Sequence, residues 1–255
     1  MKALLKYKIY VLSLNDEFER RKDINNQLSS QKQNFEFIDA IDLRHVSETE
    51  LDSYRNLKAL NSKRQLKKSE LGCMLSHQLI YEKVIKEDID FAVILEDDAF
   101  INSEFADFIN SICTEQEQIK YFDILLIGYS KLLKKDEKRF YLKEPIKKVF
   151  KIANKDIGNV WTNWTSGTVS YIITKQGAKK MVSLSNYGLA DDWGIYSSKG
   201  INVMHLRPLI CYEQFYKHES SIEAERKTFR IDKWTPKEFL RVCRGLLRYV
   251  AFRVL

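Results

Sequence analysis

Three consecutive carboxylates, Glu96, Asp97 and Asp98, stand directly after an apolar run that begins at Phe91. A short apolar run rich in branched side chains predicts a buried strand, and strand ends in α/β sheets are where ligand crevices form. Adjacent carboxylates repel one another and lose hydration when buried, unless a cation neutralises them. A hard divalent metal such as Mn²⁺ or Mg²⁺, bound together with a phosphate ligand, would resolve that conflict. A solvated acidic turn is the alternative interpretation.

A second acidic turn, Asp191 and Asp192, lies immediately before Trp193. Considered alone, the second pair fits better as the cap of a helix that starts at Trp193.

The clearest helix is expected from Ser69 to Lys86, and it carries an unusual polar stripe. Leu71, Leu75 and Leu79 lie four residues apart and form its apolar face. The stripe consists of four side chains: Glu70, Cys73, Ser76 and His77. Zinc binding by the cysteine and the histidine is one interpretation, but the sequence shows no second ligand pair. A structural histidine is another, and contact of Ser76 and His77 with a ligand is the third.

Alternating apolar and polar segments place these motifs in an α/β fold. A strand over 7–14, a helix capped by Asn15 or Asp16 and ending near Ser29, and a strand over 35–39 predict a right-handed βαβ unit and a parallel sheet. No GxGxxG follows the first strand, so a standard dinucleotide fingerprint is absent. Further strands are expected at 121–128, 149–152, 168–174 and 201–206, and further helices at 102–117 and 175–184. The lysine-rich segment 130–147 is expected to be a flexible excursion.

The composition limits the classes of protein to which this chain can belong. The chain has 255 residues, of which 44% are hydrophobic, so it can bury a sizeable core. No uncharged apolar run is long enough to span a membrane, and the start of the chain predicts no signal peptide. The four cysteines are scattered, which favours reduced thiols and a cytoplasmic location.

The basic charge is concentrated at the C-terminal end. Residues 226–255 contain nine Lys or Arg and two acidic residues, which accounts for the whole net charge of +7. The chain is therefore divided into a domain over 1–225 and a basic segment over 226–255. Four cations of this segment recur at helical spacing, at Lys237, Arg241, Arg244 and Arg248. They predict a basic amphipathic helix, which either binds an anionic membrane surface or packs its apolar face on the domain.

Seven segments, taken in order, resemble glycosyltransferase family 25, which includes bacterial lipooligosaccharide galactosyltransferases. They are VLSLNDEFERR (11–21), FEFIDAID (35–42), KSELGCMLSH (68–77), FAVILEDDA (91–99), FDILLIG (122–128), GTVSYIITKQGAKKM (167–181) and ADDW (190–193). The pairing of GC-x-x-SH with a later strand that ends in EDDA is the specific part. The resemblance covers about residues 7–222.

The resemblance implies a GT-A-like, Rossmann-type fold, a UDP-sugar donor, a divalent metal and inversion at the anomeric carbon. It assigns the metal and diphosphate to Glu96, Asp97 and Asp98. His218 follows the last expected strand and is a candidate to complete the metal or the diphosphate site. Asp191 or Asp192 would be the acceptor base. The remaining candidate donor-binding residues are Leu12, Ala40, Asp42, Glu70, Ser76 and His77.

The expected activity is therefore transfer of galactose from UDP-galactose onto a lipooligosaccharide or lipopolysaccharide, on the inner face of the inner membrane. Trp161, Trp164 and Trp193 are candidates to stack on a sugar. A metal-dependent nuclease or phosphodiesterase is the main alternative, since clustered carboxylates and a basic tail would suit it. The zero net charge of residues 1–225 argues against that alternative, and no nucleic-acid partner is expected. A catalytically silent sugar- or membrane-binding protein is the second alternative.

Overall fold

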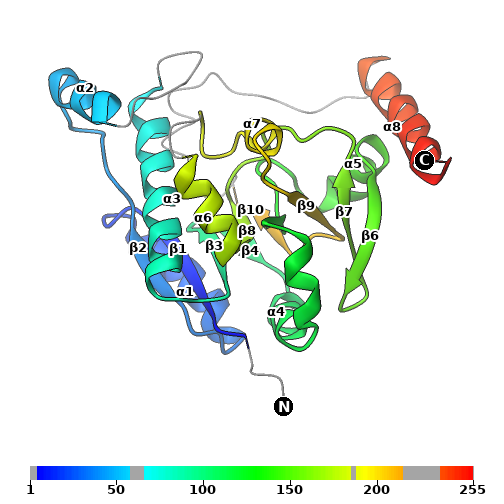
Figure 1. The fold of residues 1–255 in the computed structure, drawn as a ribbon, viewed down its shortest axis with the longest axis horizontal. Helices are drawn as coiled ribbons and strands as arrows, with labels where there is room; N and C mark the ends of the chain where they lie inside the picture. The colour runs from blue at the N-terminus through cyan, green and yellow to red at the C-terminus, as the bar shows by residue number, and fades with distance from the viewer. Residues whose placement is uncertain (1–4, 58–65, 185–187, 215–235, 255) are drawn as a thin grey trace.

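The structure, a computed structural model, describes residues 5–57, 66–184, 188–214 and 236–254. Its centre is a twisted sheet, whose strands stand in the order β2-β1-β3-β8-β5-β9-β7-β6 (Figure 1). These strands are β2 (Glu36–Asp39), β1 (Tyr7–Ser13), β3 (Phe91–Glu96), β8 (Ser170–Thr174), β5 (Ile124–Leu126), β9 (Val203–Arg207), β7 (Lys155–Val160) and β6 (Ile146–Ile152). A separate two-stranded sheet pairs β4 (Ala99–Ile101) with β10 (Cys211–Glu213).

Strands β2, β1 and β3 are parallel, which confirms the predicted βαβ unit. The sheet as a whole is mixed, because β8 runs antiparallel to both of its neighbours, β3 and β5. Strand β7 is antiparallel to β9, and β6 to β7. The predicted parallel arrangement holds for β2, β1 and β3 and also for β5 and β9, and among the described strands of this sheet β8 and β7 run in the opposite direction.

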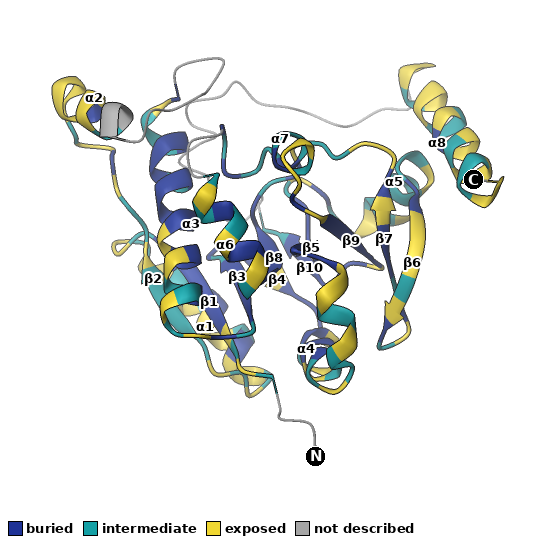
Figure 2. Ribbon diagram, viewed as in Figure 1, coloured by how far each residue is buried: buried dark blue, intermediate teal, exposed yellow. Residues whose placement is uncertain are grey.

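Helices cover both faces of the sheet. The helices are α1 (Phe18–Ser30), α2 (Glu48–Leu57), α3 (Lys68–Lys86), α4 (Phe105–Thr114), α5 (Glu137–Lys143), α6 (Lys175–Ser183), α7 (Trp193–Ser198) and α8 (Pro236–Val254). Apolar side chains of α1 and α4 pack on one face, and those of α3, α6 and α7 pack on the other. The burial colouring shows the inner strands as the core between these layers (Figure 2). The result is a three-layer α/β/α fold, as predicted.

Several local predictions were wrong. Helix α1 begins at Phe18, and neither predicted cap residue, Asn15 or Asp16, caps it. Leu79 of α3 is exposed instead of buried, because the side of the helix that packs on the sheet continues through Ile80, Tyr81 and Val84. The supposed flexible segment 130–147 contains α5 and the start of β6. The whole of β7 was missed, since its sequence, KDIGNV, is too polar and too rich in glycine to predict a strand.

Helix α8 lies at the β6 edge of the molecule, opposite α2 (Figure 1). Charged contacts hold it to the end of α5: Lys143 pairs with Glu238 at 2.8 Å, and Glu144 accepts hydrogen bonds from Arg244 and Arg248 at 2.6 and 2.7 Å. A Cβ added at Gly245 would come within 1.9 Å of the Leu142 carbonyl oxygen, so a side chain there would force the two helices apart. Part of the predicted basic face therefore contacts the domain.

The apolar side chains of α8 mostly point away from the domain. Six of them are exposed: Phe239, Leu240, Leu246, Leu247, Val250 and Val254. The alternative in which the apolar face packs on the domain is therefore wrong for these residues. Among the described residues, no helix combines the length and apolarity needed to cross a bilayer. Residues 226–235 lie outside the described residues, and the division into 1–225 and 226–255 stays a prediction.

Candidate active site

The acidic turn after β3 is built as the sequence predicted, and two residues from β1 and α1 fix its first aspartate. The Asp97 carboxylate accepts hydrogen bonds from the Ser13 hydroxyl at 2.6 Å and from the Arg20 guanidinium at 3.2 Å. The same guanidinium lies 3.9 Å from Asp98. Burial has the largest effect and raises the pKa of Asp97, although these hydrogen bonds partly offset it. Arg20 therefore supplies local positive charge to a turn that would otherwise be strongly repulsive.

Asp98 is the least satisfied of the three carboxylates. It is 8% exposed, and its Oδ1 atom has no hydrogen-bond partner among the described residues. Burial, followed by the charges of Glu96 and Glu213, raises its pKa well above the usual value. Glu213, at the end of β10, thus belongs to the site although the sequence did not indicate it. A buried, unpaired oxygen among carboxylates fits a hard divalent cation, and Asp98 is the best-placed ligand for one.

Glu96 belongs to a second polar cluster, with Cys73 and His77 of α3. One ligand atom of each residue lies within 4.8 Å of the others. His77 Nε2 is 3.4 Å from Glu96 Oε1, and its Nδ1 is 2.7 Å from the hydroxyl of Tyr171. Thr168 also donates a hydrogen bond to Glu96. Sequence spacing revealed Cys73 and His77 but not this third member, because Glu96 lies on a different element.

The electrostatics of this cluster differ from those at Asp98. Burial works to raise the pKa of Glu96, but the hydrogen bond and charge of His77 outweigh it, and the pKa is lowered. Burial, with the charges of Glu96 and Asp191, raises the pKa of the Cys73 thiol well above its usual value. Cys73 is therefore a neutral thiol in this environment, and the cluster holds Glu96 ionised and in place.

The effect on Cys73 also relates the two acidic turns. The charges of Glu96 and Asp191 both raise the pKa of the thiol of Cys73, a partly exposed residue. Asp191 is partly exposed. Asp192 caps α7, because its Oδ1 accepts a hydrogen bond from the Ile195 amide at 3.1 Å. The helix-cap interpretation of the pair is thus correct for Asp192.

Trp193 is not available to stack on a sugar. Its side chain is fully buried, and its indole nitrogen donates to the Gly167 carbonyl at 3.1 Å. Trp161 is exposed but packs on Phe252 of α8, with ring centroids 5.5 Å apart. Trp164 is half-buried and stacks on His205 at 5.3 Å. Stacking on a sugar is therefore excluded for Trp193 and stays a prediction for Trp161 and Trp164.

Three predicted donor-binding residues lie near the carboxyl ends of β1 and β2. Leu12 is buried and pairs in register with Glu96, while the Ala40 amide donates to the Ser13 carbonyl at 2.8 Å. Asp42 is exposed, and Arg44 holds it through a two-pronged contact at 2.9 and 2.8 Å. Hydrogen bonding to Arg44 lowers the pKa of Asp42. These positions border the Asp97 turn, as strand ends of a parallel unit must.

Two further predicted donor contacts, Glu70 and Ser76, have structural partners, as His77 does. The Glu70 carboxylate accepts from the Lys67 amide at 3.1 Å and so caps α3 at its first turn. The Ser76 hydroxyl, fully buried, donates to the Gly72 carbonyl at 2.6 Å and accepts from the Ile41 amide at 2.8 Å. Both side chains therefore position α3 against the β2 end, and contact with a donor stays a prediction. His218 lies outside the described residues.

A family model described as glycosyltransferase family 25 (LPS biosynthesis protein) matches residues 6–193 of this sequence. The chain belongs to this family. Human procollagen galactosyltransferase 2 is 23% identical over 247 residues, covering 88% of this chain and 37% of that protein. The Haemophilus influenzae lipooligosaccharide biosynthesis protein lic2B is 24% identical over 234 residues, covering 86% of this chain and 83% of that protein.

The two kinds of relative differ in length. The chain spans little more than a third of the procollagen galactosyltransferases but most of the bacterial relatives. Among solved structures, A197 from STIV aligns with a TM-score of 0.44 at 11% identity, covering 91% of this chain and 98% of that one. The family match confirms the predicted family, and the mixed sheet with helices on both faces agrees with the predicted α/β class.

Proposed function

We propose that this family 25 member transfers galactose from UDP-galactose, with inversion, onto a lipooligosaccharide or lipopolysaccharide acceptor. The observation that carries the proposal is the buried, unpaired Asp98 oxygen in the carboxylate turn after β3. Relatives named as galactosyltransferases and as lipooligosaccharide biosynthesis proteins support the donor and the acceptor class.

The donor side of the proposal rests on Asp97, Asp98 and Arg20. A divalent metal held by Asp98 and Asp97, with His218 as a predicted further ligand, would stabilise the leaving UDP as a Lewis acid. Arg20 lies between these two aspartates and adds a cation with the geometry to bind diphosphate oxygens. The nucleoside would lie along Leu12, Ala40 and Asp42.

On the acceptor side we assign the base to Asp191. A direct displacement needs one carboxylate to accept the proton of the attacking hydroxyl, and no protein nucleophile. Asp192 uses an oxygen to cap α7, so its removal would act first on that helix. Asp191 is partly exposed and close enough to the Cys73 region to share its environment with Glu96.

Helix α8 is proposed to hold the enzyme at an anionic membrane surface. Its exposed apolar side chains form an unpartnered face, of which Leu247, 73% exposed, is the centre. Arg241 and Arg253 add exposed positive charge on the same helix. An outward apolar face flanked by cations suits the boundary between lipid headgroups and acyl chains, where a lipid-linked acceptor would be found.

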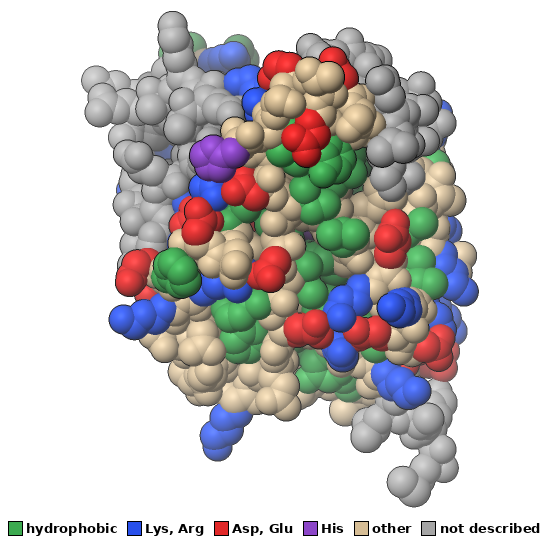
Figure 3. Space-filling model, turned by 90° about the vertical axis from the view of Figure 1, so that its left-hand side faces the viewer, with side chains coloured by type: hydrophobic (Ala, Val, Ile, Leu, Met, Phe, Trp, Pro, Cys, Tyr) green, Lys and Arg blue, Asp and Glu red, His purple; other side chains and the backbone are tan. Residues whose placement is uncertain are grey.

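A nuclease remains the less favoured function. Family 25 membership opposes it, and so does the neutral charge of the core domain. The face over β2, α1 and α3 carries acidic and basic side chains intermingled, without a basic channel (Figure 3). Polyphosphate-backbone binding depends on a concentrated positive surface.

The test is a donor screen. Purified protein is incubated with UDP-galactose, UDP-glucose and UDP-N-acetylglucosamine, each with and without Mn²⁺ and a truncated lipooligosaccharide. We expect metal-dependent UDP release that is fastest with UDP-galactose, and NMR of the product should show the opposite anomeric configuration to the donor. Absence of UDP release from all three donors would reject the proposal, and retention of configuration would reject the single displacement.

A further inference from the structure

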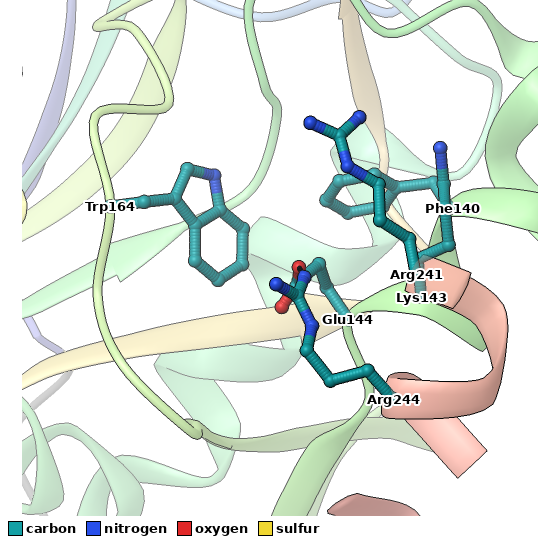
Figure 4. A pocket seen from close by; sticks show the side chains of 6 residues that line it. All are labelled: Phe140, Lys143, Glu144, Trp164, Arg241 and Arg244. Carbon is teal, nitrogen blue, oxygen red and sulfur yellow. Dashed lines mark hydrogen bonds and ion pairs between the residues drawn. The ribbon is translucent and has the colours of Figure 1, made fainter. Parts of the chain in front are cut away.

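A cavity of about 250 Å³ lies between α5, α8 and the loop that joins β7 to β8. Six side chains line it: Phe140, Lys143, Glu144, Trp164, Arg241 and Arg244 (Figure 4). In the close-up, Trp164 stands on one side and faces the charged side chains across the cavity. The space is below the usual range for a drug-sized ligand, so its occupant is one small ring or group.

The charge balance of this cavity is positive. Four cations surround it or hold its wall, and they share two carboxylates: Lys143 and Arg241 pair with Glu238, and Arg244 and Arg248 pair with Glu144. The Arg241 and Arg244 side chains are 46% and 49% exposed. Two guanidinium groups at the mouth of a cavity offer planar, multiple donors to a phosphate or carboxylate.

The opposite wall is apolar and rigid. Trp164 stacks on His205 with an interplanar angle of 24°, and Phe140 packs against Trp164 with ring centroids 6.1 Å apart. His205 is completely buried, and its ring is fixed by hydrogen bonds to Tyr129 and Asn163. A fixed aromatic wall opposite cations suits a ligand that has both an apolar ring face and an anionic group.

The cavity is linked to the proposed transfer site by one short loop. The loop that carries Trp164 also carries Gly167, which accepts from Trp193, and Thr168, which donates to Glu96. Four residues of chain span at most about 14 Å, so Trp164 lies within that reach of Thr168. The Asn163 amide bonds Ser197 of α7, the helix that follows Asp191. The cavity therefore adjoins the acceptor side.

We propose that this cavity binds a sugar residue of the acceptor that carries a phosphate or carboxylate group, separate from the sugar that is extended. This inference rests on the proposed glycosyl transfer, because it assigns the cavity to that reaction's acceptor. A phosphate group could also belong to a lipid headgroup, and the experiment separates these two sources.

The test uses the full-length protein and the double variant Arg241→Ala/Arg244→Ala. Glu238 and Glu144 keep Lys143 and Arg248 as partners in this variant, so α8 stays paired to the domain. Arg139→Ala is the matched control, because Arg139 of α5 pairs with Asp136 and does not line the cavity. Two acceptor oligosaccharides are compared that differ only by one phosphate group.

The loss of two charge-assisted contacts should raise the KM for the phosphorylated acceptor by about tenfold or more. The KM for the dephosphorylated acceptor should change less than about twofold, and the control should match the wild type. Equal KM values of the wild-type enzyme for both acceptors would overturn the proposal. So would a variant that loses binding to phosphatidylglycerol vesicles but keeps its preference for the phosphorylated acceptor, since the arginines would then serve lipid.

A direct binding arm separates failure of this inference from failure of the proposed function. Glucose 6-phosphate and glucose are titrated into the protein by calorimetry, with UDP and Mn²⁺ present to fill the donor site. The wild-type protein should bind glucose 6-phosphate at least about tenfold more tightly than the double variant does. It should also bind glucose 6-phosphate more tightly than it binds glucose. This comparison needs no catalysis. If the protein binds glucose 6-phosphate in this way but shows no transfer, the cavity proposal stands and the proposed function is rejected. Equal binding by wild type and variant would reject the site.

Discussion

Asp98→Asn should have opposite effects on stability and on activity. Asp98 is buried beside Glu96, Asp97 and Glu213, and Arg20 is the cation that the structure places near it. Asparagine has nearly the same shape but no charge, so the substitution removes repulsion without leaving a cavity. In buffer with EDTA at pH 8, where ionisation of Asp98 is most costly, the free energy of unfolding should rise by on the order of 1 kcal/mol.

The same substitution should nearly abolish transfer, because it removes a charged ligand of the metal that stabilises the leaving UDP. Loss of one preorganised electrostatic group typically lowers turnover by about 100- to 1000-fold. Urea unfolding monitored by fluorescence gives the stability, and UDP release from UDP-galactose gives kcat/KM. Mn²⁺ should raise the midpoint of unfolding for the wild type and have little effect on the variant.

Asp107→Asn is the control, because Asp107 is an exposed acidic residue in the first turn of α4. It should leave transfer at the wild-type rate and change stability by less than about 0.5 kcal/mol. Full transfer by Asp98→Asn in Mn²⁺ buffer would refute the assignment of Asp98. A variant that is less stable than the wild type in EDTA would refute the electrostatic account of the turn.

Three further predictions concern other parts of the molecule. Asp191→Asn should lower kcat while leaving UDP-sugar affinity nearly unchanged, whereas Asp192→Ala, which removes the capping oxygen, should mainly destabilise α7, by about 1 kcal/mol; the reverse pattern in kinetics and urea unfolding would exchange the two roles. Leu247→Glu should reduce sedimentation with anionic liposomes at low salt, whereas the control Val149→Glu, at an exposed position of β6, should not. Equal sedimentation of the two variants would rule out α8 as the anchor. Although burial works to raise the pKa of Glu87, hydrogen bonds from two lysines and a tyrosine hold it at about 2. Glu87→Gln should therefore lower the free energy of unfolding by about 1 kcal/mol at pH 7. In urea titrations the difference between variant and wild type should shrink as pH falls from 4.5 towards 2. A difference that does not depend on pH would show that the charge of Glu87 is not its cause.

The structural features that the sequence predicted correctly are those that neighbouring residues encode. The apolar run from Phe91 to Leu95 ends in acids, and the structure places it as a central strand followed by the site. Likewise, the first βαβ unit, α3 and the final helix follow from hydrophobic periodicity, although the predicted caps of α1 were wrong. Asp192 as a helix cap was also predictable, because a short polar residue before an aromatic helix start is a local signal.

The missed features depend on contacts between distant segments. Arg20 reaches Asp97 from 77 positions earlier, and Glu213 reaches the Asp98 environment from a strand near the end of the domain. No local pattern marks either residue, although Arg20 lies within the segment 11–21 that carries the family resemblance. The sequence left open which side of α8 meets the domain, since contacts of Glu144 with Arg244 and Arg248 decide it.

The central claim is that the turn after β3 binds a metal and the diphosphate of a UDP-sugar. Thermal unfolding of the intact protein with UDP, UDP-sugars, Mn²⁺ and oligonucleotides tests it most directly. At about 100 times its Kd, UDP with Mn²⁺ should stabilise the fold by about 2.7 kcal/mol and raise Tm by roughly 5–10 °C. UDP without metal should have a much smaller effect, and oligonucleotides none. A Tm that rises with oligonucleotides and Mn²⁺ but not with UDP would contradict the claim and favour a nuclease.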